Sequence, residues 1–465
     1  MNTRRWATLG LTMLLGAGVS AICGAQTPPS WHAGVAKADI TPAESMWVAG
    51  YASRKTPSDG TLHPLWLKAL ALQDVQGQRA VIVTSDHLGF PKGMSDRIRD
   101  RIKERLGLER GQILLSSSHT HSGPVLDDSL LCIYPLDDTQ RKKITEYSRM
   151  LEDKTVETAV QAFHDLVPVQ LASGSGVTRF AVNRRTNKEA EILDTHDLNG
   201  PVDHAVPVLK VARADGSLLA VLFGYACHST VLDLCQWSGD YPGFAQIELE
   251  KTYPGCTAMF FAGCGADQNP LPRRTIAIAR QYGRELAAAV ERVIADPMQT
   301  LDPSLKIEYA DIELALEAPP TREQFEAMLP TSPWFIQDAI KGFIKDLDAG
   351  KPLRTSYPYP VQMWRLGAQN LVALGGEVVV DYAILVKQVL GRDTFVAGYA
   401  NDVMSYIPSR RVLREGGYEG KNAQPEYGMP NAYREDIEER ILTAVRDQAQ
   451  RAGATPIAAE LPSTQ

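Results

Sequence analysis

The sequence predicts an α/β fold in which a layered mixed sheet is flanked by helices within a single large domain. Short apolar runs of strand length alternate with longer stretches of helical length along the chain. Strands that alternate with helices are typical of layered α/β domains. The 465 residues are 44% hydrophobic and 22% charged, which is an ordinary globular composition, and neither an internal repeat nor a long linker divides them.

The N-terminus carries the pattern of an export signal. A pair of arginines precedes an apolar run over residues 9–22, and the small residues Gly24 and Ala25 follow. We expect residues 1–25 to be a signal peptide cleaved after Ala25, which makes the protein secreted or periplasmic. The run is short for a membrane span. Cys23 leaves a lipoprotein open as the less favoured alternative, and the arginine pair leaves twin-arginine export open beside the general route.

The remaining chain supplies the predicted elements. Buried strands are expected at seven apolar runs, namely 69–72, 80–84, 113–116, 206–211, 218–223, 258–261 and 371–374. Helices are expected at 93–106, 144–163, 275–294 and 322–347. The proline-rich stretches near 318–334 and 351–360 are expected to be loops, and 454–465 is expected to be a disordered tail after a domain over 26–453.

Charge and cysteine content exclude several classes of protein. The net charge of −7 and the lack of a basic stripe give no reason to expect nucleic-acid binding. After the signal the cysteines are odd in number and form no CxxC pair, which excludes a zinc ribbon and a dense disulfide framework. One disulfide or a set of buried free thiols stays open for Cys132, Cys227, Cys235, Cys256 and Cys264.

The first candidate site is the segment SSSHTHSGP at 116–124, directly after a predicted strand. Residues i and i+2 of an extended chain point to the same side, so His119 and His121 can face one site at the strand end. Taken alone, two polar residues at a strand end are an equally good interpretation.

Three further strand ends repeat this layout. His228 follows the run 218–223, Glu377 follows two glycines after the run 371–374, and Asp267 and Asn269 lie in a glycine-rich turn after 258–261. A structural histidine or a helix N-terminal charge would explain any one of them. Together they indicate a built site.

Four motifs give the chain its resemblance to a known family. HTHSGP, ACHST, GGE and NDVMSYIPSRRVLREGGYEG occur in the order and rough spacing of the neutral, non-lysosomal ceramidases. The long motif is the most specific, because Tyr406 and the YEG tyrosine Tyr418 keep the twelve-residue interval of that family. The chain therefore resembles the catalytic N-terminal domain of these enzymes.

The resemblance implies one zinc ion and a set of site residues. It makes His119, His228, Glu377 and Tyr406 the zinc ligands, a donor set that suits a borderline-soft dication. It assigns the substrate carbonyl and its developing charge to three hydrogen-bond donors, His121, Arg184 and Tyr418.

The chain departs from the family at Asn269, which stands where the ceramidases carry a serine. An amide cannot be a hydroxyl nucleophile, so a mechanism that depends on that serine is excluded, whereas a water activated by zinc remains available. Asn269 is then expected to orient the water or the scissile amide. Asp86 and His87, after the run 80–84, are expected to have supporting or structural roles.

These inferences predict a zinc-dependent hydrolase of linear N-acyl amides, acting on ceramide or a related lipid or small-molecule amide. Peripheral membrane contact for substrate access is expected, without a transmembrane helix in the mature chain. Two alternatives stay open. One is a different secreted metallohydrolase acting on an ester or on a sugar-derived or peptidoglycan amide, and the other is a non-catalytic binding protein of the same fold.

Overall fold

The computed structural model describes residues 1, 30–457 and 461–464. The expected signal peptide, apart from its first residue, lies outside the described residues. Among the described residues, none of the helices combines the length and the hydropathy needed to cross a lipid bilayer.

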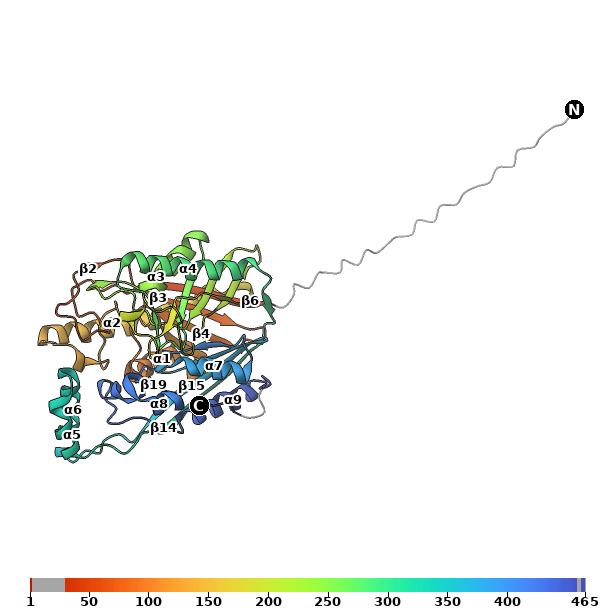
Figure 1. Ribbon diagram of the computed structural model, residues 1–465. Coiled ribbons are helices and arrows are strands. Elements are labelled where there is room, and N and C mark those ends of the chain that lie inside the picture. The colour runs from red at the N-terminus through yellow and green to blue at the C-terminus, as the bar shows by residue number, and fades with distance from the viewer. Residues whose placement is uncertain (2–29, 458–460, 465) are drawn as a thin grey trace.

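A nine-stranded mixed sheet forms the centre of the described chain (Figure 1). Along the sheet the order is β11 (Thr257–Ala262), β9 (Leu218–Tyr225), β8 (Ala205–Arg213), β6 (Val167–Val177), β1 (Trp31–Asp39), β3 (Trp66–Gln73), β4 (Arg79–Ser85) and β5 (Ile113–Ser117), and β13 (Gln299–Leu301) pairs with β6. The pairs β4–β5 and β9–β11 are parallel and the others antiparallel. The predicted strands all fall inside these elements or inside β16 of the second sheet.

The second sheet packs on one face of the first. Its order is β14 (Leu305–Ala315), β15 (Ser356–Leu366), β16 (Gln369–Leu374) and β18 (Phe395–Ala397). Side chains of β16 alternate between two cores: Leu371 and Ala373 face the large sheet, whereas Val372 and Leu374 belong to the cluster with the outer helices. A strand with both faces buried consists of a continuous apolar run, and this run is why the sequence predicted β16.

Helices cover the outer faces of both sheets and complete a four-layer arrangement. Helices α1 (Lys92–Leu106), α2 (Asp138–His164), α3 (Asp240–Thr252) and α4 (Ile276–Ala295) pack on the large sheet. Helices α7 (Val380–Leu390) and α9 (Ile437–Arg451) pack on the second sheet. The predicted layered mixed sheet flanked by helices is confirmed.

Two expected elements differ from the structure. The single helix expected at 322–347 is two helices, α5 (Arg322–Met328) and α6 (Trp334–Asp348), because Pro330 and Pro333 cannot continue a helical hydrogen-bond ladder. The pair extends along one edge of the molecule (Figure 1).

The loop expected at 351–360 contains the start of β15. Pro358 and Pro360 are tolerated there because this end of β15 pairs only with β14, so one side of the strand needs no donor.

The described part of the expected tail contacts the body of the protein. Ile457 donates its backbone N–H to Val389 of α7, and the Thr464 hydroxyl donates to Glu438 at 2.6 Å. The expected disorder of 454–465 stays a prediction.

Short elements at one end of the sheets carry the candidate site. They are β7 (Ala181–Asn183), β12 (Gln268–Pro270), β17 (Glu377–Val378), β19 (Tyr406–Ile407), α8 (Arg410–Glu415), the π-helix η5 (Tyr418–Asn422) and the 3-10 helix η6 (Gln424–Tyr427). The remaining short strands are β2 (Gly60–Thr61) and β10 (Gln236–Trp237).

Candidate metal and active site

Two buried histidines lie in turns that meet beyond the carboxyl ends of β5 and β9. Thr120 and Ser229 form a bridge between these turns, and the Ser229 hydroxyl donates to Ser118 O at 2.7 Å. His119 Nδ1 lies 2.6 Å from Leu88 O, and His228 Nδ1 lies 2.8 Å from Gly265 O. A backbone carbonyl opposite Nδ1 requires the proton there, so Nε2 of both rings keeps its lone pair for the site.

The geometry that brings His119 and His121 together is not the expected one. Strand β5 ends at Ser117, and His119 adopts a left-handed backbone with φ 54°. The two rings therefore share one site because the chain turns, not because an extended chain alternates. Gly50 permits this packing, since a Cβ at that position would lie 2.3 Å from His121 Nδ1.

Glu377 reaches the two histidines from the second sheet. After β16 the left-handed Gly376 (φ 76°) redirects the chain into β17, where Glu377 pairs in register with Tyr406 of β19. Glu377 Oε2 lies 3.3 Å from His119 Nε2 and 3.2 Å from His228 Nε2. Burial opposes ionisation of this carboxyl, but the two histidines hold its pKa well below the usual range.

This convergence fits a metal ion. His228 Nε2 and Glu377 Oε2 are buried and make no hydrogen bond to any residue that the structure describes. Ligands about 2.0–2.1 Å from a tetrahedral zinc ion lie roughly 3.3 Å apart, which is the separation found here. His121 belongs to the same group, because nitrogens of His119, His121 and His228 all lie within 4.8 Å of one another. The group could hold a metal ion, with His121 as a further ligand or as a neighbour of the ligands.

The histidines are suited to binding as neutral rings. Burial, reinforced by Arg184, lowers the pKa of His228 to about 4. Burial, reinforced by His119, also holds the pKa of His121 well below its ordinary value.

Arg184 links the candidate ligand Tyr406 to the other side of the site. It follows β7, and its guanidinium donates to Tyr406 Oη at 3.1 Å and Glu419 Oε1 at 2.7 Å. Burial would lower the pKa of Arg184, but Tyr406 and Glu419 raise it, so the cation is retained. Its third contact, at 3.5 Å, is Asn269 Oδ1.

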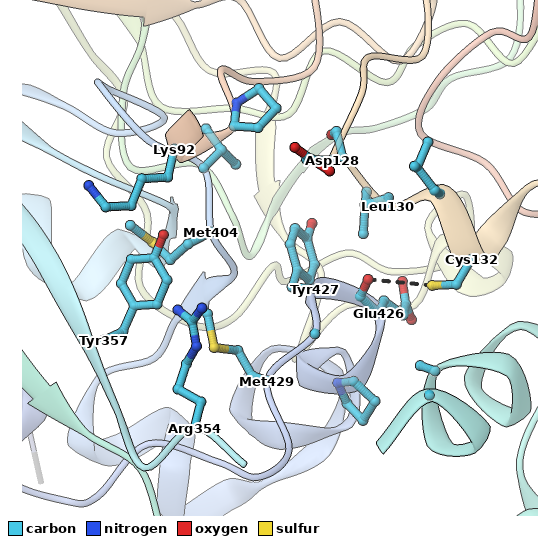
Figure 2. Close-up of a pocket in the computed structure, with 18 of the residues that line it drawn as sticks. Lys92, Asp128, Leu130, Cys132, Arg354, Tyr357, Met404, Glu426, Tyr427 and Met429 are labelled. Atoms are coloured by element: carbon cyan, nitrogen blue, oxygen red, sulfur yellow. Dashed lines mark hydrogen bonds between the residues drawn. The ribbon is translucent and has the colours of Figure 1, made fainter. Parts of the chain in front are cut away.

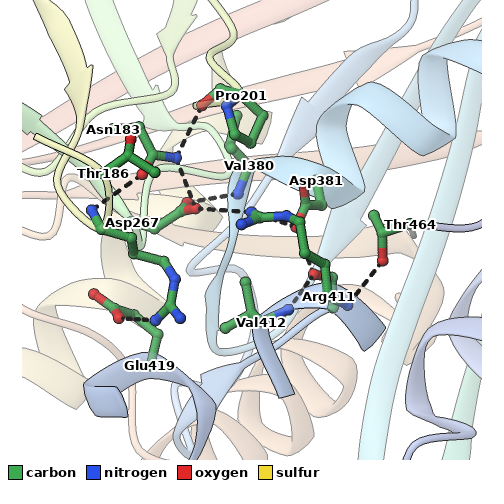
Figure 3. A network of polar contacts seen from close by, with 12 residues as sticks. Asn183, Thr186, Pro201, Asp267, Val380, Asp381, Arg411, Val412, Glu419 and Thr464 are labelled. Atoms are coloured by element: carbon green, nitrogen blue, oxygen red, sulfur yellow. Dashed lines mark hydrogen bonds and ion pairs between the residues drawn. The ribbon is translucent and has the colours of Figure 1, made fainter. Parts of the chain in front are cut away.

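Asn269 and Asp267 come from the same glycine-rich segment but contact different residues. Asn269 lies in β12, in register with Val182 of β7, which brings its side chain to Arg184. The carboxylate of Asp267 accepts from Val380 N at 2.8 Å and Asn183 Nδ2 at 3.2 Å (Figure 3). Asp267 therefore ties β7 to the first turn of α7 and is not brought to the histidines.

Tyr418 lies at the solvent-exposed edge of the site. The residue is 44% exposed, its ring centroid lies 5.2 Å from that of Tyr406, and the Arg184 guanidinium lies 5.9 Å from it. Its hydroxyl donates to Glu426 Oε2 at 3.2 Å. The donor expected to hold a carbonyl thus stands at the accessible edge of the site.

The sequence did not reveal the supporting role of η6. Its three polar side chains each contact one candidate site residue: Gln424 donates to Tyr406 O at 3.2 Å, Glu426 accepts from Tyr418, and Tyr427 Oη donates to Glu377 Oε1. Tyr427 and Glu426 also line a cavity of about 510 Å³ behind the site (Figure 2). No local pattern signals these contacts, because Glu377 lies fifty positions earlier in the chain.

Asp86 and His87 are buried directly after β4. Asp86 Oδ2 accepts from Trp66 N at 3.0 Å and so joins the ends of β3 and β4. His87 is fully buried against Phe90 at 4.3 Å, and burial lowers its pKa to about 3. The five cysteines among the described residues are free thiols, which resolves the open alternative against a disulfide.

Comparisons with known proteins agree on one family. The profile of "Neutral/alkaline non-lysosomal ceramidase, N-terminal" matches residues 31–266. The neutral ceramidase of Pseudomonas aeruginosa is 22% identical over 83% of this chain and 68% of its own length. That of Drosophila melanogaster is 24% identical over 50% of this chain, a match that spans 34% of the relative.

The fold comparison reaches further along the chain. The crystal structure of the Pseudomonas aeruginosa neutral ceramidase superposes with a TM-score of 0.71 at 20% identity, covering 94% of this chain and 77% of that one. A ceramidase structure "complexed with C2" superposes with a TM-score of 0.69 over the same shares.

Proposed function

The chain belongs to the neutral/alkaline non-lysosomal ceramidase family, and on that premise we propose that it is a zinc-dependent hydrolase of N-acyl amide bonds. One observation carries the proposal. Nε2 of His119 and Nε2 of His228 lie 3.3 and 3.2 Å from Oε2 of Glu377, and neither His228 Nε2 nor Glu377 Oε2 makes a hydrogen bond among the described residues. Two neutral imidazoles and a carboxylate form a common ligand set of catalytic zinc.

The proposed ligands are His119, His228 and Glu377, with Tyr406 as a weaker fourth. When bound, zinc supplies Lewis-acid polarisation of the amide carbonyl and makes a water acidic enough to attack it near neutral pH. Tyr427 holds the Glu377 carboxylate in one orientation through its hydrogen bond to Oε1.

The donors around the site match the charge that develops during amide hydrolysis. Arg184 carries a permanent charge, and Tyr418 presents a phenol at the open edge. Both can donate to the carbonyl oxygen as it becomes an oxyanion. His121, which lies beside His119 and His228, can accept a proton from the attacking water at a ring nitrogen and pass a proton to the leaving amine, so that water and amide become carboxylate and amine.

Asn269 has an orienting role in this scheme. Its Oδ1 faces Arg184 at 3.5 Å, and an amide forms no covalent acyl intermediate. The water is therefore the nucleophile that the site requires.

The test is hydrolysis coupled to metal analysis. Purified protein with zinc is expected to release fatty acid from fluorogenic N-acyl amides and to lose this activity with chelator. His228→Ala should lower zinc content strongly, because an incomplete ligand set binds poorly. The control is His204→Ala, whose ring contacts Ala181 O at 2.9 Å and none of the ligands. Full zinc occupancy in His228→Ala would refute the ligand assignment.

The same experiment separates the alternatives. Zinc binding without turnover of any amide would favour a binding protein of this fold. Turnover of esters but not amides would favour a different metallohydrolase.

We also propose that the protein works outside the cytoplasm. The support is the pattern of arginines, apolar run and small residues over 1–25. N-terminal sequencing of protein from a bacterial host should find a chain that begins at Gln26, whereas retention of Met1 would contradict the proposal.

A further inference from the structure

A cavity of about 540 Å³ adjoins the carbonyl-binding side of the site. We name it the charged cavity, because its lining includes Arg184, Arg185, Glu189, Arg273, Glu415 and Glu419. Asn269 and Tyr418 also line it. A group bound to the reacting carbonyl therefore has direct access to this cavity.

The charges of the cavity are already paired within its walls. Arg185 lies 2.5 Å from Glu419 and 2.9 Å from Glu415, and Arg184 lies 2.7 Å from Glu419. Arg273 forms a separate ion pair with Glu189. Three arginines face three glutamates, so the lining has no net charge but many donors and acceptors.

This lining discriminates between chemical groups. A hydrocarbon would displace water from the ion pairs without replacing its hydrogen bonds. An anion would compete with carboxylates that already hold the arginines. A neutral group with several hydroxyls can bond to the partly exposed Glu415 and Glu189 (side chains 42% and 38% exposed) without separating a pair.

A second cavity shares Tyr418 but has different walls. It measures about 500 Å³ and is lined partly by Met328, Phe335 and Ile336 of the α5–α6 region. In the charged cavity, by contrast, Leu271 is the one aliphatic side chain among the described lining residues. A long hydrocarbon tail thus finds apolar contacts in the second cavity and not in the charged one.

We infer that the charged cavity binds the amine half of the substrate, and that this half is a compact, uncharged, hydroxyl-rich group of the amino-sugar type. The inference rests on the proposed function, because the cavity adjoins the carbonyl site. The inference excludes amides of long-chain amino alcohols as preferred substrates, because their hydrocarbon tail would have to lie against ion pairs.

The first test compares amides that share one acyl chain. With zinc-loaded protein, kcat/KM for an N-acylglucosamine should exceed that for an N-acylsphingosine and an N-acylglutamate by about tenfold or more, because two added hydrogen bonds are worth about that factor. Preference for the N-acylsphingosine would overturn the inference while leaving amide hydrolysis intact.

A charge variant tests the cavity itself. Glu415→Gln leaves the lining with one excess positive charge and should raise the relative kcat/KM for the N-acylglutamate several-fold. Glu157→Gln is the control, because Glu157 is 61% exposed, pairs with Arg105 and does not line the cavity. Equal selectivity in the two variants would count against the inference.

A binding measurement separates this inference from the proposed function. Zinc-free protein is titrated by calorimetry with N-acetylglucosamine, N-acetylglutamate and N-butylacetamide, which share an acetyl group. Strongest binding of N-acetylglucosamine, weakened in Glu415→Gln, would support the inference even if no amide were hydrolysed. Strongest binding of N-butylacetamide would overturn it whatever the activity.

Discussion

Replacing Tyr427 by Phe removes one hydroxyl and little else. That hydroxyl donates to Glu377 Oε1, while Oε2 of the same carboxylate lies between the two histidines. Without the donor the carboxylate can rotate, and its free oxygen is left buried beside an aromatic ring. Tyr427→Phe should therefore weaken metal binding without changing the ligands.

The expected magnitude follows from two independent arguments. A hydrogen bond to a charged group contributes about 1.5–3 kcal/mol. Loss of a group that orients a metal ligand costs roughly 10–100-fold in affinity, or about 1.4–2.7 kcal/mol. Both arguments place the zinc dissociation constant of Tyr427→Phe one to two orders of magnitude above that of the wild type.

The assay is competition for zinc with a chromophoric chelator at neutral pH. Tyr382→Phe is the matched control, because Tyr382 is fully buried and donates to Pro408 O at 3.0 Å, away from the ligands. Far-UV circular dichroism confirms that both variants are folded. Equal zinc affinity in the two folded variants would refute the positioning role of Tyr427.

Three further predictions follow from the site and its surroundings. Arg184→Ala, which removes a donor 3.1 Å from Tyr406 Oη, should keep its zinc and lose kcat by about 10²–10³-fold, and a change confined to KM would indicate simple anchoring. Asn269→Ser should retain zinc and substantial hydrolysis, since the proposed nucleophile is water. Trapping of an acyl-enzyme on the wild type, sought by quenched-flow mass spectrometry, would contradict this. Burial raises the pKa of Asp402, which accepts a hydrogen bond from Tyr357, to about 7. The folded state therefore holds this proton more tightly than the unfolded chain, and the free energy of unfolding should fall as pH rises from about 4 to about 7, by about 4 kcal/mol at most. Asp402→Asn should flatten that slope in urea titrations at pH 5 and pH 8, and an unchanged slope would contradict the assignment.

The sequence predicted those strands whose burial produces a short continuous run of apolar residues. The run 371–374 was visible because both faces of β16 are buried. The break between α5 and α6 falls inside the proline-rich stretch 318–334 expected to be a loop, whereas the single helix expected at 322–347 ran across it, because the apolar spacing continues past Pro330 and Pro333.

For the site, the motifs identified residues but not the geometry that joins them. His119 and His121 were expected to share a face by strand alternation, whereas a left-handed backbone at His119 brings them together. Glu426 and Tyr427 left no signal, since their roles arise from contacts across the chain. These contacts form only when the second sheet packs against the first, so no local sequence pattern indicates them.

The division of the proposed ligands between the two sheets has a consequence for how the protein folds. His119 and Glu377 are 258 positions apart in the chain, and the family profile ends at residue 266, before Glu377 and Tyr406. Closing so long a loop is entropically costly, so contacts of this range form late. The rate of zinc binding should then report the rate of the last step of folding. In a refolding experiment, metal uptake would lag behind collapse of the large sheet and coincide with its docking to the second, and chelation would loosen that docking first.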